Sequence, residues 1–191
     1  KKSPGSQYVW NKTQLDALDL KKTKHLLGLF EPAHMNFEAD RVKDRSGEPS
    51  LADMTRSAIT VLKNNPKGFF LMVEGGRIDH AHHSGNAFRA LSDTVAFSDA
   101  VRTAMSMTSD KDTLIIVTAD HSHTMTFAGY PARGNPILGK VIGASGEGPS
   151  AGYALDATGM PYTTLAYANG PGYTGASDQQ QEGIKKFPHQ M

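Results

Sequence analysis

Cysteine is absent from the 191 residues, so the chain can form neither a disulfide nor a cysteine-ligated metal site. A run of about 18 apolar residues, the length that spans a bilayer as a helix, is also missing. Neither sign of charge dominates, because 20 Lys and Arg residues accompany 19 Asp and Glu residues. This balance argues against nucleic-acid binding, which needs a clustered basic surface. Any transition-metal site must therefore use histidine, aspartate and glutamate.

Two short apolar segments flank a helical pattern in the middle of the chain. The segments "FFLMV" (residues 69–73) and "TLIIVT" (residues 113–118) are bounded by turn residues, which is typical of buried strands. Between them, residues 86–107 carry apolar side chains at helical spacing. A strand, a helix and a strand in this order predict a parallel, right-handed βαβ unit. The expected fold class is therefore α/β with a parallel sheet.

Weaker patterns surround this unit. Residues 8–20 predict the end of a strand, a turn and a short helix, and a second helix is expected from Leu51 to the "NNPKG" turn. After Tyr130 the sequence becomes rich in glycine, proline and serine, with one more strand expected within residues 162–170. We therefore expect a core at residues 1–129 and a looser, loop-rich region at residues 130–191.

A charged cluster follows each apolar segment: "VEGGRIDHAHHSGN" at residues 73–86 and "TADHSHT" at residues 118–124. Because the carboxyl ends of parallel strands meet at one edge of a sheet, both clusters are expected at that edge, where open α/β sheets bind ligands. Carboxylates with imidazoles suit zinc, whereas a lone glutamate suits magnesium. The candidate metal ligands are Glu74, Asp79, His83, Asp120 and His121.

Less specific explanations exist for these residues. A single Asp-His pair at a strand end is more often a surface or loop-capping feature, but two pairs at one edge fit paired divalent ions, a recurring device of phosphoryl chemistry. At least one further histidine is expected to support a ligating carboxylate through its ring N–H, and His82 is expected to be a bystander. Ser84 and Ser122 lie among the candidate ligands, but neither has a sequence context that indicates a nucleophile.

The two clusters and their flanking segments resemble the alkaline phosphatases. The likeness includes "FFLMVEGGRIDHAHH" and "DTLIIVTADHSHT", and it extends to "YVWN", "GLFEP", "NPKGFF", "FAGYPARG" and "ANGPGY". It is strongest to the animal-type and related bacterial branch. The resemblance implies a partial α/β metal-binding core at residues 1–129, followed by a loop-rich insertion of the crown type at residues 130–191.

The resemblance also implies a function, namely hydrolysis of phosphate monoesters through a phosphoserine intermediate with two zinc ions and one magnesium ion. Carried over residue by residue, Asp79 and His83 would bind the first zinc ion. Asp120 and His121 would bind the second zinc ion, and Glu74 would bind magnesium.

Further roles come from the same resemblance. His80 stands where a side chain approaches the phosphate or its water, and His123 stands where a histidine supports the zinc-bound aspartate. Tyr130 matches a tyrosine that reaches across the dimer interface in animal members. A calcium site is also implied, with Phe30 (through its carbonyl), Glu31 and Glu48 as candidates.

The implied setting is a homodimer that acts on small phosphate monoesters and does not bind nucleic acid as such. Family resemblance places it in the periplasm or outside the cell, with attachment to an outer membrane leaflet or cell surface through termini outside this chain. The first ten residues lack the apolar core of a signal peptide.

The sequence departs from the family at several functional positions. A nucleophilic serine in a D-S-A context, the phosphate-binding arginine, a metal-bridging aspartate and a late histidine in an H-x-G-E-D-type segment are all missing, and His189 is not in that context. We therefore expect a central-to-C-terminal fragment that is inactive alone. The alternatives are a non-catalytic metal-binding module, which the missing nucleophile favours, and another superfamily hydrolase. A sulfatase would need a C/S-x-P-x-R segment, which is absent.

Overall fold

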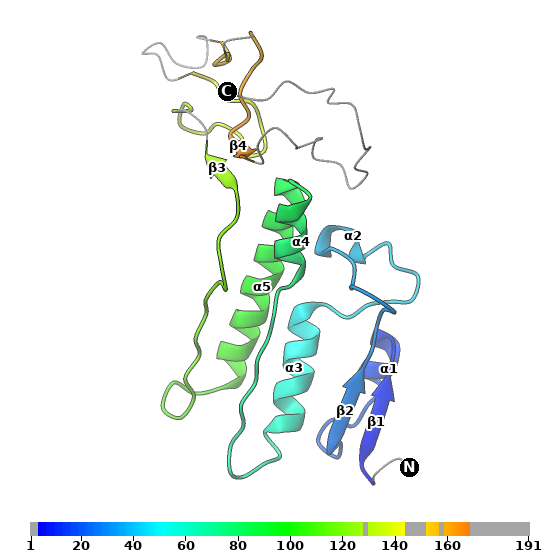
Figure 1. Ribbon diagram of the computed structural model, residues 1–191. Helices are drawn as coiled ribbons and strands as arrows, with labels where there is room; N and C mark the ends of the chain where they lie inside the picture. The colour runs from blue at the N-terminus through cyan, green and yellow to red at the C-terminus, as the bar shows by residue number, and fades with distance from the viewer. Residues whose placement is uncertain (1–3, 128–129, 144–151, 157–158, 169–191) are drawn as a thin grey trace. The chain divides into compact units, whose positions relative to one another are not determined.

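The computed structural model describes residues 4–127, 130–143, 152–156 and 159–168 (Figure 1). The chain divides into two compact units, which are described separately. The first comprises Lys1–Ile78 with Leu91–Thr118, and the second comprises Asp79–Ala90 with Ala119–Met191. The expected division into residues 1–129 and 130–191 stays a prediction.

The first unit contains a small parallel sheet. Strand β1 (Ser6–Val9) pairs in parallel with β2 (His25–Gly28), from Ser6 opposite His25 to Val9 opposite Gly28. Helix α1 (Lys12–Asp16) lies in the connection between these strands, and its N-cap residue Asn11 accepts a hydrogen bond from the backbone N–H of Gln14 at 2.9 Å. The α/β fold class with a parallel sheet is confirmed, and so are the strand end and short helix predicted near the N-terminus.

Helix α3 (Leu51–Leu62) begins at a capping box. The Ser50 hydroxyl oxygen accepts the backbone N–H of Asp53 at 3.1 Å, and the Asp53 carboxylate accepts the backbone N–H of Ser50 at 3.1 Å. These two bonds satisfy backbone donors that the first helical turn leaves without an intrahelical partner. Ile59 is one of the buried residues of this helix. The predicted helix from Leu51 is confirmed.

Two further helices complete the first unit. Helix α2 (Glu38–Arg41) is a single short turn, which carries an ion pair between Arg41 and Glu38. Helix α5 (Ala87–Met107) has 21 residues, begins in the second unit and confirms the predicted long helix. Charged residues interrupt its apolar positions, and among the described residues no helix combines the length and hydropathy needed to cross a membrane.

The two apolar segments of the sequence behave differently from the prediction. Residues 69–73 and 113–118 form no strand in the structure, so the predicted βαβ unit is wrong for these residues. Their side chains are largely exposed, with Phe70 at 89%, Leu114 at 84% and Ile116 at 77%. A strand needs a neighbour that accepts and donates its backbone hydrogen bonds. The parallel ladder of this unit instead joins β1 to β2.

The second unit is built from short pairings. Strand β3 (Met125–Phe127) pairs antiparallel with β4 (Leu165–Tyr167), so Met125 lies opposite Tyr167. Isolated bridges elsewhere in the unit include Ile142 with Tyr153, and Val141 is fully buried. Strand β4 confirms the strand predicted within residues 162–170. Helix α4 (Arg77–His83) connects to the start of this unit and supplies Asp79 and the residues that follow it.

The capping box of α3 leads to a stability prediction. Ser50→Ala should lower the free energy of unfolding by about 1 kcal/mol, because the first turn loses a side-chain acceptor. Thr60→Ala is the matched control, since Thr60 lies inside the same helix and its hydroxyl donates only to the Arg56 carbonyl at 2.8 Å. The control should change stability by less than about 0.5 kcal/mol. Urea unfolding followed by circular dichroism measures both, and equal losses would contradict the capping role.

Candidate metal centre

Helix α4 presents Asp79 and His83 on one face. The two residues are one helical turn apart, and His83 Nε2 lies 3.4 Å from Asp79 Oδ2. The helix ends at His83. Two residues later, Gly85 has a positive φ of 62°, which glycine adopts easily, and its N–H donates to the His82 carbonyl at 2.9 Å. The helical turn anticipated for this pair is therefore present.

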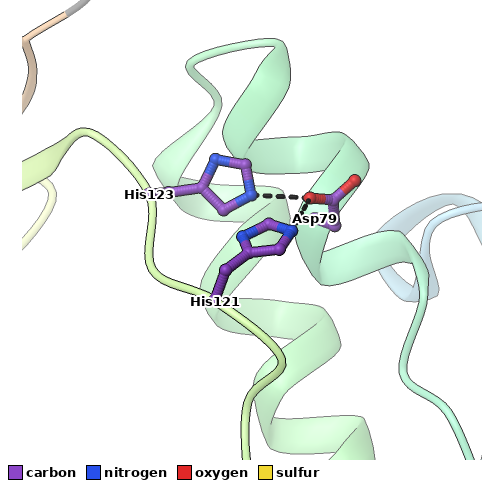
Figure 2. A group of neighbouring side chains, drawn as sticks. All are labelled: Asp79, His121 and His123. Atoms are coloured by element: carbon purple, nitrogen blue, oxygen red, sulfur yellow. Dashed lines mark hydrogen bonds and ion pairs between the residues drawn. The ribbon is translucent and has the colours of Figure 1, made fainter.

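The segment after Thr118 brings two more imidazoles to the same carboxylate (Figure 2). His123 Nε2–H donates to Asp79 Oδ1 at 2.6 Å, and His121 Nε2 lies 3.6 Å from the same oxygen. The spacing of two residues places both rings on one side of an extended chain. His121 Nε2 also lies 3.4 Å from Asp120 Oδ2. One imidazole thus lies close to two carboxylates.

The charges of the cluster favour an ionised Asp79. Partial burial by itself raises the pKa of the Asp79 carboxyl, but the hydrogen bond from His123 and the nearby imidazolium charges lower it further than burial raises it. The net effect is a pKa below the ordinary value for aspartate. The carboxylate is therefore available as an anionic ligand over a wide pH range.

The pKa values of two histidines, His121 and His82, are shifted in opposite directions. The Ser122 carbonyl accepts a hydrogen bond from His121 Nδ1 at 3.0 Å, and this bond, together with the Asp120 charge, raises the pKa of His121. Burial, followed by the charge of His123, lowers the pKa of His82. A raised pKa means that His121 holds a proton more strongly, and a metal ion would have to displace it.

His82 belongs to the cluster rather than standing apart as expected. Its Nδ1 atom shares a hydrogen bond of 2.9 Å with the hydroxyl of Tyr167 on β4. Its ring stacks on the His123 ring, with centroids 4.8 Å apart and an interplanar angle of 25°. Sequence reasoning missed Tyr167, which lies 85 residues from His82. A tyrosine in a short strand gives no pattern that would have identified it.

The donor set fits a divalent metal ion. One ligand atom each from Asp79, His121 and His123 lies within 4.8 Å of the other two. Carboxylate oxygen and imidazole nitrogen are the ligand types that zinc prefers when cysteine is absent. The structure thus brings together Asp79, His83, Asp120 and His121, which the sequence proposed as zinc ligands, although their individual roles stay predictions.

The roles of three other predicted site residues, Glu74, His80 and Tyr130, stay predictions. Glu74 belongs to the first unit, so its magnesium role stays a prediction. The backbone carbonyl of His80 accepts the backbone N–H and the hydroxyl of Ser84, both at 3.1 Å. Tyr130, the predicted dimer residue, is 89% exposed.

The candidate calcium residues belong to the first unit. Glu48 is buried, and its two carboxylate oxygens accept the backbone N–H of Asn36 at 3.0 and 3.1 Å. Burial raises the pKa of Glu48, and the neighbouring charge of Glu31 raises it further. Phe30 directly precedes Glu31 in the chain. The calcium role of Phe30, Glu31 and Glu48 stays a prediction.

Comparisons with known proteins all find similarity to one family. The family model for alkaline phosphatase matches residues 1–189. The tissue-nonspecific isozyme of alkaline phosphatase from Rattus norvegicus is 49% identical over 168 residues, which are 88% of this chain and 30% of that protein. The isozyme from Homo sapiens is 48% identical over the same shares. The chain thus spans about 30% of the length of these curated relatives.

A solved structure agrees with these matches. The crystal structure of Thermus thermophilus alkaline phosphatase is similar with a TM-score of 0.50 and 34% sequence identity. The similarity covers 56% of this chain and 22% of that chain.

The opposite pKa shifts of His121 and His82 can be measured directly. In the metal-free chain, the imidazole of His121 should titrate above the ordinary histidine value of about 6.5, and that of His82 should titrate below it. As the pH falls, His121 should therefore gain its proton first. Two-dimensional NMR of the ring carbons, in the presence of a chelator and assigned with His121→Gln and His82→Gln, gives both midpoints. The reverse order would contradict the geometry of the cluster.

Proposed function

The chain belongs to the alkaline phosphatase family, and on this premise we propose that it supplies part of the metal centre of a phosphomonoesterase. The observation that carries the proposal is the convergence of Asp79, His121 and His123 on one point. These side chains come from two parts of the sequence, 44 residues apart between Asp79 and His123. A carboxylate and two imidazoles are ligand types that zinc prefers when cysteine is absent, and their convergence supports a metal-binding role.

Two zinc ions and one magnesium ion are the metals that we propose. Asp79 and His83 are assigned to one zinc ion, Asp120 and His121 to the other, and Glu74 to magnesium. The position of His121 supports adjacent ions, because its Nε2 lies 3.6 Å from Asp79 and 3.4 Å from Asp120. When bound, such ions supply Lewis acidity toward a phosphoryl group and lower the pKa of an oxygen nucleophile.

The residues of this chain would bind and orient. Asp79 would contribute a negative charge to a lower pH than an ordinary aspartate does, because its pKa is lowered. His123 holds one oxygen of that carboxylate by donating its Nε2–H, so the other oxygen is directed toward His83. His80 is proposed to contact the phosphate or its water. Because recognition is directed at the charged phosphoryl group, small phosphate monoesters with varied alcohol portions are the proposed substrates.

The chain alone is proposed to be inactive. No D-S-A segment supplies a nucleophilic serine within the 191 residues. We propose that the nucleophile, the phosphate-binding arginine and the remaining ligands come from parts of the enzyme outside this chain. The missing nucleophile also favours a second candidate, a metal-binding module without catalysis. Dimer formation through Tyr130, calcium binding near Glu48 and a periplasmic or extracellular location are further parts of the proposal.

A chimaera distinguishes the two candidates. Lys1–Met191 would replace the corresponding segment of the tissue-nonspecific isozyme, and release of 4-nitrophenol from its phosphate ester would be followed at alkaline pH. We expect chelator-sensitive turnover. His121→Ala should lower kcat/KM by about 10²–10³-fold, the loss typical of removing one group that stabilises transition-state charge. Glu74→Gln should lower it less.

The matched control is His25→Ala, which removes an exposed histidine on β2 in the first unit. This control should retain the activity of the parent chimaera. Zinc content measured on the same samples should fall in His121→Ala and not in His25→Ala. A chimaera with full zinc content and no turnover would favour the non-catalytic module.

The inactivity of the chain alone is tested by the same assay on Lys1–Met191. We expect no turnover above that of the assay buffer, with or without added zinc. Robust turnover that a chelator abolishes would contradict the need for an external nucleophile. Ser84→Ala and Ser122→Ala would then identify which of the two serines acts as the nucleophile.

A further inference from the structure

We propose that Tyr167 is a positioning residue for the metal centre, acting through His82 to hold the His123 ring in the orientation that binds Asp79. This inference rests on the proposed function, since the metal centre that Tyr167 would support is the one proposed above. The contacts that carry it all lie within the second unit.

The contacts form a continuous series. The Tyr167 hydroxyl and His82 Nδ1 share a hydrogen bond of 2.9 Å. The His82 ring stacks on the His123 ring at 4.8 Å between centroids. His123 Nε2–H then donates to Asp79 Oδ1 at 2.6 Å. Each step connects a side chain further from the cluster to one nearer to it.

Backbone pairing fixes the position of Tyr167. In the β3–β4 ladder Tyr167 lies opposite Met125, which follows His123 by two positions. Next to this pair, the backbone N–H of Ala168 donates to the Thr124 carbonyl at 2.9 Å. The same ladder therefore sets the position of the tyrosine and of the segment that carries His123. With the backbone paired in this way, the Tyr167 hydroxyl already lies within hydrogen-bond distance of His82.

His123 requires such support because its hydrogen bond depends on direction. An N–H donor weakens steeply when it turns away from its acceptor, and an imidazole can rotate about two side-chain bonds. The ring of His82 covers one face of His123, and the ring of His83 meets it at 88° with centroids 5.0 Å apart. These contacts leave the Nε2–H directed at Asp79. The hydroxyl of Tyr167 keeps the His82 ring from rotating out of the stack.

The first test needs no metal. In the metal-free chain, NMR of the ring nitrogens should show His123 as the Nε2–H tautomer with slow exchange of that proton. Tyr167→Phe keeps the aromatic ring and removes the hydroxyl, so the Nε2–H of His123 should exchange several-fold faster and the second tautomer should appear. Tyr153→Phe is the matched control, because Tyr153 lies in the same unit with its ring 5.4 Å from the Lys140 amine. The control should leave the His123 signals unchanged.

The second test measures metal affinity. Titration with Co²⁺, followed by its visible absorption, should give a dissociation constant about 3–10-fold weaker in Tyr167→Phe than in the parent chain. This effect is smaller than the 10–100-fold that loss of a direct partner of a ligand costs, because Tyr167 is further removed. His82→Ala should weaken binding at least as much. Tyr167→Phe combined with His82→Ala should add nothing to His82→Ala alone, because the two residues act in series.

Each outcome decides a separate point. Unchanged exchange and tautomer of His123 in Tyr167→Phe would overturn the positioning role, and so would additive losses of Co²⁺ affinity in the double variant. A lowered unfolding midpoint with unchanged His123 signals would show that Tyr167 is structural only. If the parent chain binds no Co²⁺ more tightly than Asp79→Asn does, the proposed metal centre fails. The metal-free test would then still decide whether Tyr167 positions His123.

Discussion

The hydrogen bond from His123 to Asp79 is the contact on which the arrangement of the cluster depends. It joins helix α4 to a segment 44 residues further along the chain, at a distance of 2.6 Å. A donor that meets a carboxylate at this distance is a strong, charge-assisted partner. The bond fixes one carboxylate oxygen, lowers the pKa of the group and leaves the other oxygen near His83.

The parts of this cluster that could be predicted are those set by local geometry. Asp79 and His83 are four residues apart on a helix, and His121 and His123 are two residues apart on an extended segment, so each pair shares a face. The expectation that the two charged clusters meet rested on the predicted parallel βαβ unit, which residues 69–73 and 113–118 do not form, and on the likeness to a known family. His82 and Tyr167 could not be matched in this way, because nothing in either local pattern indicates a partner 85 residues away.

The same limit explains the error about the apolar segments. A run of apolar residues reports that a segment is to be buried, but a strand also needs a hydrogen-bonded neighbour, which the pattern does not identify. Helices α3 and α5 were predicted correctly because a helix satisfies its backbone within its own segment. Residues 69–73 and 113–118 form no helix, and their exposed apolar side chains, among them Phe70 and Leu114, favour association with other apolar surfaces.

The division of the chain into two units separates the proposed metal roles. Asp79, His83, Asp120 and His121 all belong to the second unit, so their mutual distances are set by α4 and by the β3–β4 ladder. Glu74 and Glu48 belong to the first unit. The proposed zinc ligands therefore lie close together within the second unit, to which Glu74 does not belong.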